Sequence, residues 1–370
     1  MAPGARGLNY LLKHDPGLEA SRLRTVLIKA ERWRRRDRWR RSLHRLSPRV
    51  DRLPLDRPIF VLGIQGGGTT LVSRCLLRHT AAVSMSGNSS YWVATDEIGF
   101  VRNRMNRLPK GLWSSAHRFD LEHPLLGTEH ASVYGSDLLV DAYRGTAEYA
   151  TIEDAARFKR LIREHIAVYA DDPSHARFVD KTHTYTLKIP YLDQLLAGHD
   201  PHFVLVVRNP YTICFRAVRR KPPSWRRVVP YEEQLRLVAQ HWVNSNRRAL
   251  EDGPATGRFL AVRFEDFVRA PEDVIRAVCG HVGLSYDDAL VPRAGDTFPF
   301  ATLPWDRKWF PLHEDEWRGR VGDADAAIIE DECRGLADEL GYGRRDDATP
   351  VHPAVLRLGG SEPGGAALVA

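Results

Sequence analysis

The stretch PIFVLGIQGGGTTLVSRCLL, residues 58–77, decides the fold because it joins a buried strand to a helix through a glycine turn. An apolar run ends at Leu62, the glycines follow, and the apolar residues after Thr70 are spaced as on a helix. Turns of this kind point backbone N–H groups at a phosphate, and phosphate loops normally also carry a lysine or arginine. This loop has neither. By itself it indicates either a phosphate site without its usual cation or a purely structural turn.

Short apolar runs alternate with helical patterns along the rest of the chain. The runs typical of buried strands lie at 177–180, 203–208 and 259–264, and the helical patterns at 155–169 and 232–250. This alternation predicts an α/β fold with a central parallel sheet flanked by helices, in a single domain over residues 51–343. Ligands of such sheets bind beyond the carboxyl ends of the strands, where we expect both the glycine loop and Arg208.

Composition excludes several classes of protein. The 370 residues are 43% hydrophobic and 27% charged, enough to bury a large core. No run approaches the ~18 apolar residues of a spanning helix, and the first residues lack the apolar segment of a signal peptide. The four cysteines show no CxxC spacing, and no His/Cys/Asp cluster has ligand spacing. We therefore expect a cytoplasmic protein without a metal site.

The two ends of the chain differ from the domain. Residues 1–50 form a basic arm that contributes to a net charge of +7, and residues 22–46 combine helical spacing with many arginines. That segment indicates either a solvated helix packed by one face or an interfacial helix at the inner membrane surface, with Trp33 and Trp39 among the headgroups. Nucleic acid is a weaker alternative, since no base-reading module follows. The Gly/Ala/Pro-rich tail at 344–370 is expected to be disordered.

The glycine loop does not fit the common nucleotide motifs. Gly63 and Gly68 have the spacing of a Walker A loop, but Thr69 and Thr70 stand where that motif requires Lys-Ser/Thr. A P-loop kinase is therefore the least favoured of the functions considered. The dinucleotide pattern GxGxxG is not matched either.

Two further stretches carry candidate functional residues. In VVRNPYTICFR a strand ends on Arg208 and a helix follows, so the arginine and the helix N-terminus can both face a phosphate. In VDKTHTYTLKIP, Lys181 and His183 are two residues apart and point the same way in extended backbone. A cation beside an imidazole suits a charge stabiliser beside a general base.

Together, and in this order, these stretches resemble the sulfotransferases that use the donor PAPS (3′-phosphoadenosine 5′-phosphosulfate). The resemblance extends from Pro58 to Tyr342. It includes FLAVRFEDF, similar to the family's later strand and helix, LPWDRKWF, similar to its basic C-terminal segment, and the closing ADELGYG.

The resemblance implies roles for individual residues. His183 would be the catalytic base and Lys181 would neutralise charge at the transferred group. A carboxylate past the loop is the base in some carbohydrate-sulfating members, and Glu97 is the alternative base here. The residues expected to bind the donor are Gly66, Gly67, Gly68, Thr69, Thr70, Arg208, Arg216, Phe264, Arg307 and Lys308.

Three of these positions depart from the family's pattern. Arg216 replaces a serine, and Phe264 replaces a tyrosine, so it can stack near adenine but cannot hydrogen-bond. Gly66 stands where the family has its loop lysine or arginine, which stabilises charge on the bridging oxygen. Losing such a group typically costs ~10²–10³ in rate. Lys181 is our first candidate to fill the space.

The expected function is transfer of a sulfuryl group from PAPS to a hydroxyl of a carbohydrate, glycolipid or other small molecule. Residues 112–130 and 219–231 are candidates for the acceptor pocket, with Trp113, Trp225 and Tyr231 available for stacking. Because of Gly66, a non-catalytic protein that binds PAP (adenosine 3′,5′-bisphosphate) or PAPS is the main alternative.

Overall fold

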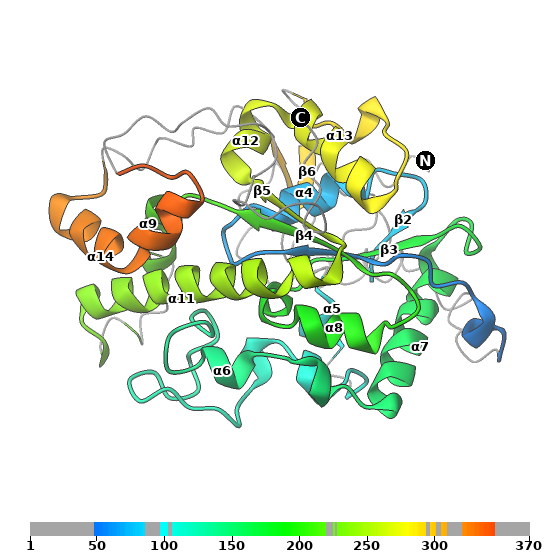
Figure 1. The fold of residues 1–370 in the computed structure, drawn as a ribbon, viewed down its shortest axis with the longest axis horizontal. Helices are drawn as coiled ribbons and strands as arrows, with labels where there is room; N and C mark the ends of the chain where they lie inside the picture. Colours follow the sequence, from blue (N-terminus) through cyan, green and yellow to red (C-terminus); the bar gives the residue numbers. More distant parts are fainter. Residues whose placement is uncertain are drawn as a thin grey trace, which may run out of the picture.

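A five-stranded parallel sheet lies at the centre of the molecule, as the sequence predicts (Figure 1). The structure, a computed structural model, describes residues 48–85, 97–102, 106–219, 225, 228–293, 297–300, 305–308 and 320–344. In spatial order the strands are β2 (Ala82–Val83), β3 (Arg177–Asp180), β1 (Ile59–Leu62), β4 (His202–Val207) and β5 (Phe259–Arg263). The chain leaves β1 toward β2 and leaves β4 toward β5, so the strand order reverses between β1 and β4, and ligands of such sheets bind outside the carboxyl ends of the strands at that point.

Helices cover both faces of this sheet (Figure 1). On one face lie α4 (Thr69–Leu76), α12 (Phe264–Arg269) and α13 (Pro271–Val282). On the other lie α5 (Ile98–Val101), α6 (Val140–Tyr143), α7 (Ile152–Tyr169), α8 (Ile189–Leu195) and α11 (Tyr231–Asp252). Beyond the carboxyl end of β4, α9 (Pro210–Arg219) and α14 (Asp323–Glu339) pack against α11.

Strand β1 shows why the strands read as continuous apolar runs. Ile59 and Val61 contact the core beneath α4 and α13, whereas Phe60 and Leu62 contact the core shared with α7, α8 and α11. All four side chains are buried, because alternate residues of a strand point to opposite faces and both faces are covered.

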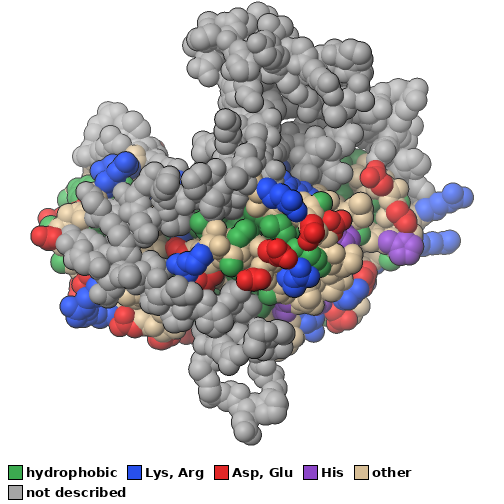
Figure 2. All heavy atoms as spheres, turned by 90° about the horizontal axis from the view of Figure 1, so that it is seen from above, with side chains coloured by type: hydrophobic (Ala, Val, Ile, Leu, Met, Phe, Trp, Pro, Cys, Tyr) green, Lys and Arg blue, Asp and Glu red, His purple; other side chains and the backbone are tan. Residues whose placement is uncertain are grey.

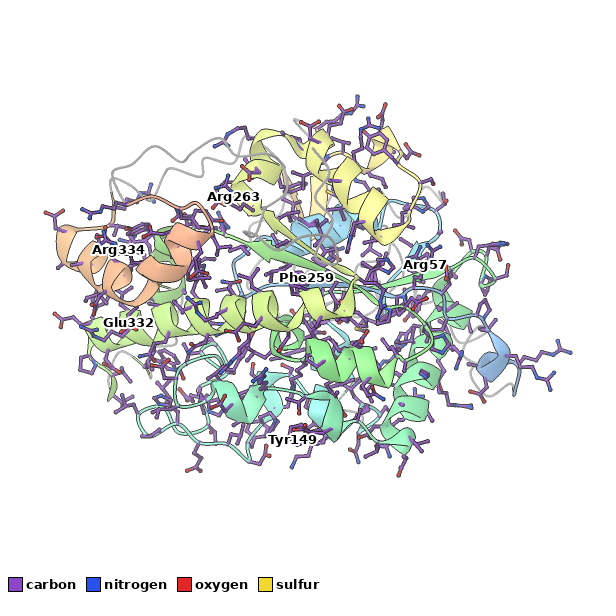
Figure 3. All side chains as sticks on the ribbon, in the orientation of Figure 1. Arg57, Tyr149, Phe259, Arg263, Glu332 and Arg334 are labelled. Atoms are coloured by element: carbon purple, nitrogen blue, oxygen red, sulfur yellow. The ribbon has the colours of Figure 1, made fainter. Side chains whose placement is uncertain are left out.

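The carboxyl end of β5 differs from the sequence-based expectation. Phe264, expected to end the strand, instead begins α12. Arg263, the last strand residue, is completely buried (Figure 3) and pairs with Asp266 at 2.7 and 2.9 Å. A buried guanidinium is stable only with such a partner, so the pair fixes the turn from strand to helix.

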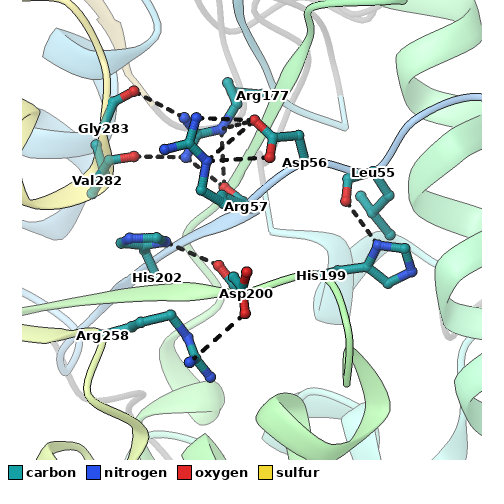
Figure 4. Close-up of polar contacts among 10 residues, drawn as sticks. All are labelled: Leu55, Asp56, Arg57, Arg177, His199, Asp200, His202, Arg258, Val282 and Gly283. Atoms are coloured by element: carbon teal, nitrogen blue, oxygen red, sulfur yellow. Dashed lines mark hydrogen bonds and ion pairs between the residues drawn. The ribbon is translucent and has the colours of Figure 1, made fainter.

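At the opposite, amino end of the sheet a polar network joins the strands to α13 (Figure 4). Arg177 donates to the carbonyls of Val282 at 2.7 Å, Gly283 at 3.1 Å and Arg57 at 2.7 Å. The last carbonyls of a helix have no intrahelical donor, so Arg177 completes the end of α13. This network has a structural role and leaves the carboxyl end of the sheet for function.

A second, antiparallel sheet of two strands was not predicted from the sequence. It pairs β6 (Thr297–Phe300) with β7 (Trp305–Lys308).

On the face shown in Figure 2, described Lys and Arg side chains are interspersed with Asp and Glu and form no single basic patch. None of the described helices is both long and apolar enough to cross a bilayer. The arm at 1–47 and the tail from 345 lie outside the described residues.

Candidate active site

The glycine loop follows β1 and is held by the segment after β3. The Gly63 amide donates to Thr186 Oγ1 at 2.8 Å, and the Gly67 amide turns back onto the Ile64 carbonyl at 3.0 Å. Helix α4 begins at Thr69, and its first turn closes where the Leu71 amide donates to the Gly68 carbonyl at 2.9 Å. The amides of Gly68, Thr69 and Thr70 precede that bond, as the unpaired donors at the start of a helix do.

Two glycines of the loop are required by its backbone. Gly66 and Gly68 have φ of +87° and +95°, a region that L residues with side chains rarely adopt. A Cβ on Gly68 would lie 2.0 Å from Cδ2 of Phe264, so the ring of Phe264 fills the space beside the loop. A Cβ on the exposed Gly66 would meet only Ile213 Cδ1 among the described atoms within 4 Å, at 3.6 Å. The loop is therefore closed on the Phe264 side and open at Gly66.

Arg208 reaches the loop from the end of β4. Its Nη1 donates to the Gly66 carbonyl at 2.7 Å, and its guanidinium lies 4.6 Å from the centre of the Phe264 ring. The backbone around it is fixed, because the indole of Trp242 donates to the Arg208 carbonyl at 2.8 Å. Arg208 thus contacts Gly66, whereas Lys181, our first candidate to fill the space at this glycine, donates to Glu97.

The start of α9 differs from the expectation that its amides face a phosphate. The side-chain oxygen of Asn209 accepts from the amides of Tyr211 at 2.9 Å and Thr212 at 3.3 Å, so these donors are already engaged. The Thr212 hydroxyl, in contrast, is buried and has no hydrogen-bond partner among the described residues. A buried hydroxyl of this kind is costly unless something pairs with it.

The three candidate catalytic residues meet at one carboxylate oxygen. Lys181 Nζ lies 2.9 Å and His183 Nδ1 3.2 Å from Oε1 of Glu97. On the other side of the imidazole, His183 Nε2 lies 3.3 Å from Thr69 Oγ1 of the glycine loop. Contrary to expectation, the backbone is not extended through His183, because a 3-10 helix begins there, yet the side chains of Lys181 and His183 both reach Glu97.

Glu97 is held in place from the end of β3. The amide of Ile98 donates to Asp180 Oδ1 at 2.9 Å, and the amide of Gly99 donates to Thr182 Oγ1 at 3.1 Å. The same Asp180 accepts from the Thr182 amide through its other oxygen at 3.1 Å. One buried aspartate therefore fixes both the Lys-Thr-His segment and the residue that follows Glu97.

The electrostatics of this cluster keep Glu97 ionised. Burial alone would raise the pKa of Glu97, but the charges of Lys181 and His183 lower that pKa well below its usual range. A carboxylate can only accept, so His183 donates from Nδ1 to Glu97, and in the neutral form of the imidazole the lone pair then lies on Nε2. That nitrogen faces the glycine loop and can accept a proton.

Comparison with known proteins agrees with this geometry. Residues 58–288, more than half of the chain, match the family model described as the sulfotransferase family. The chain belongs to the sulfotransferase family. No curated protein matches this sulfotransferase.

Several solved structures are similar to this sulfotransferase. The sulfotransferase domain from the curacin biosynthetic pathway is 18% identical over 79% of this chain and 99% of that domain, with a TM-score of 0.45. Sulfotransferase STF9 from Mycobacterium avium is 15% identical over 82% of each chain, with a TM-score of 0.46. Retinol dehydratase in a complex with retinol and PAP is 14% identical over 67% of this chain and 66% of its own, with a TM-score of 0.31.

Other residues expected in the site lie elsewhere or outside the description. Arg216 is exposed on α9, Trp225 is completely buried with its indole donating to the Glu129 carbonyl, and Tyr231 bonds Asp325 of α14. Trp113 packs on the core and donates to the Leu108 carbonyl. Arg307 and Lys308 lie on β7, where only the backbone is described.

A second chain of polar contacts in this sulfotransferase was not predicted from the sequence. Nε2 of His241, in the middle of α11, lies 3.3 Å from Oε1 of Gln65 in the glycine loop. The ring of Tyr134 packs edge-on against that imidazole, with 4.4 Å between ring centres. His241 sits in an ordinary helical pattern and Tyr134 in a stretch without periodicity, so only the folded chain brings them to the loop.

The described residues hold no group of three His, Cys, Asp or Glu placed for a metal ion.

Proposed function

We propose that this sulfotransferase moves a sulfuryl group from PAPS to a hydroxyl of a small-molecule or glycan acceptor. The observation that carries the proposal is the chain Glu97–His183–Thr69, which holds the imidazole by Nδ1 and sets its Nε2 against Thr69 at the start of the glycine loop. PAPS supplies an activated sulfuryl group, which leaves PAP behind when it passes to an oxygen acceptor.

Two features of the chain fit the donor. A loop whose glycines leave no room for a Cβ at Gly68, followed by the backbone amides at the start of α4, suits the 5′-phosphosulfate. The fixed Arg208 and the buried, unpartnered hydroxyl of Thr212 suit the 3′-phosphate. The proposed donor contacts are Gly66, Gly67, Gly68, Thr69, Thr70, Arg208 and Phe264, with Arg216, Arg307 and Lys308 as further candidates.

His183 and Glu97 would then share the proton chemistry rather than compete for it. His183 Nε2 would take the proton of the acceptor hydroxyl, and Glu97 would stabilise the imidazolium that results while holding its Nδ1–H. Lys181, bonded to the same carboxylate, would place a positive charge beside the transferred group. Glu97 is thus proposed as a positioning residue and His183 as the base.

Binding and turnover test separate parts of this proposal. PAP should raise the melting temperature, Arg208→Ala should remove most of that shift, and Arg276→Ala, which removes an exposed arginine on α13, should leave it intact. His183→Ala should lower kcat with labelled PAPS by about 10²–10⁴ and keep the PAP shift.

The main alternative, a protein that binds the nucleotide without catalysis, predicts a different pattern. It would give the PAP shift without transfer to any of a panel of hydroxyl acceptors. Absence of the shift in the wild type would contradict the donor site itself.

For the arm at 22–46 we keep the proposal of peripheral contact with anionic membranes, which sedimentation with vesicles tests.

A further inference from the structure

We propose that Tyr134 binds the acceptor, donating a hydrogen bond from its phenol to an oxygen adjacent to the hydroxyl that is sulfated. The acceptor class is then a vicinal diol, as on a sugar ring, rather than a simple alcohol. This inference rests on the proposed function, because it assigns the acceptor side of the same site.

The first observation is that the Tyr134 hydroxyl is buried without a partner. The side chain is 0% exposed, and its oxygen has no hydrogen-bond partner among the described residues. An unpaired buried hydroxyl costs stability, so a chain that retains one has a reason outside its own packing. The neighbouring Tyr143 differs, since its hydroxyl bonds His130 Nε2 at 2.8 Å.

The second observation is that Tyr134 is held rigidly. Its ring lies 4.4 Å from the His241 ring and 5.6 Å from the Tyr143 ring. The next residue, Gly135, donates from its amide to His241 Nδ1 at 3.0 Å and accepts at its carbonyl from Asn244 at 3.0 Å. The turn is therefore attached to α11 through both the amide and the carbonyl of Gly135, which pre-organises the phenol.

The third observation connects this turn with the catalytic cluster. Because His241 Nδ1 accepts from Gly135, its Nε2 carries the proton and donates to Gln65 Oε1 of the glycine loop at 3.3 Å. Burial raises the pKa of Tyr134 well above its usual range, and the charge of Glu97 raises it further, so the phenol stays protonated and lies within the field of that carboxylate. A neutral phenol packed on His241, which itself contacts Gln65 of the glycine loop, can serve as a hydrogen-bond donor for an acceptor oxygen.

The test compares Tyr134→Phe with Tyr143→Phe, which removes a paired hydroxyl from the adjacent ring. The probes are cis-1,2-cyclohexanediol and cyclohexanol, titrated calorimetrically into full-length protein saturated with PAP. We expect Tyr134→Phe to weaken diol binding about tenfold and to leave cyclohexanol binding unchanged. Its melting temperature should equal or exceed that of the wild type, because an unpaired polar atom is removed. Tyr143→Phe should lower the melting temperature and keep the diol preference.

Equal loss of both probes in Tyr134→Phe, an unchanged diol preference, or a wild type that binds neither probe would overturn the inference. The PAP-induced shift, measured in the same proteins, reports on the donor site independently. Turnover with labelled PAPS reports on the proposed reaction. A protein that binds PAP and prefers the diol but transfers no sulfuryl group would thus refute the proposed function and support the role of Tyr134 in binding.

Discussion

Replacing Glu97 with glutamine tests the link between the buried carboxylate and the base. The substitution keeps the shape of the side chain and one carbonyl oxygen but removes the negative charge. In the wild type one oxygen, Oε1, accepts from Lys181 at 2.9 Å and from His183 at 3.2 Å. The neutral amide cannot compensate the buried ammonium of Lys181.

The structure sets the size of the stability loss. The side chains of Glu97, Lys181 and His183 are 17%, 5% and 13% exposed, so solvent screens the cluster little. Breaking a buried ion pair from one side typically costs about 3–5 kcal/mol. Because the glutamine oxygen still accepts one bond, we expect the lower end, about 3 kcal/mol, which corresponds to a fall of roughly 6–12 °C in Tm for a domain of this size.

The pH dependence of that loss follows from the pKa of Glu97. The folded-state pKa lies well below the ordinary value of about 4.3, so the stabilisation is fully present above about pH 4–5 and is lost as the pH falls through the folded value. The difference in Tm between wild type and Glu97→Gln should therefore be largest near pH 7 and shrink in acid.

The kinetic effect should exceed what the stability loss explains. Without the carboxylate, neither the tautomer of His183 nor its protonated form is stabilised, and we expect kcat with labelled PAPS to fall by about 10²–10⁴ at unchanged PAP affinity. Glu164→Gln is the matched control, because Glu164 is a buried carboxylate on α7 that pairs with Arg107 away from the loop. It should lower Tm and keep kcat. A Glu97→Gln protein with wild-type kcat and Tm would refute the reasoning.

Three further predictions concern the loop and a buried lysine. Gly66→Lys should not raise kcat, because a φ of +87° disfavours a lysine by about 1–2 kcal/mol and because Arg208 already contacts this residue. Gly66→Ala measures how much of the effect comes from the backbone conformation alone, and a rise in kcat for Gly66→Lys would contradict the prediction. Gly68→Ala should lower Tm and remove the PAP-induced shift in Tm, because its Cβ would lie 2.0 Å from Phe264. Adding Phe264→Ala should restore part of the stability. A Gly68→Ala protein with the Tm and PAP shift of the wild type would show that the ring moves aside at no cost. Burial and, secondarily, the charge of Arg118 lower the pKa of Lys188 to about 7. Between pH 7 and about 10 the unfolded chain therefore binds more protons than the folded protein does, so the stability of the wild type should rise with pH over that interval. In Lys188→Met the urea midpoint should lose this rise, and an equal slope in both proteins would rule it out.

The sequence was sufficient for four of the five strands of the parallel sheet and for several contacts of the candidate site. Parallel strands buried on both faces read as apolar runs, and their carboxyl ends meet at one edge, which brings together Arg208, Lys181 and the glycine loop. The pair of Lys181 and His183 could be placed from local geometry alone. Glu97 was predicted only as an alternative base, because nothing in the local sequence indicates that a residue after β2 contacts both Lys181 and His183.

Contacts between distant segments could not be predicted in this way. Trp225 has an aromatic ring that could stack on a ligand, but its burial depends on how the chain before α11 packs. Tyr134, His241 and Gln65 are separated by more than 60 residues at each step and meet only because α11 crosses beside the loop. Such contacts depend on tertiary packing, which propensity and periodicity do not encode.

The cation that contacts the glycine loop is Arg208 rather than Lys181. The guanidinium contacts the carbonyl of Gly66, the position at which the resemblance expected a lysine or arginine, while Lys181 is engaged by Glu97. A charge-assisted bond to a phosphate oxygen is stronger than a bond to a neutral carbonyl, so the same guanidinium can exchange Gly66 for a donor phosphate with little movement. We therefore propose that the glycine loop and Arg208 bind the donor together, with the positive charge supplied from the end of β4 rather than from the loop's own sequence.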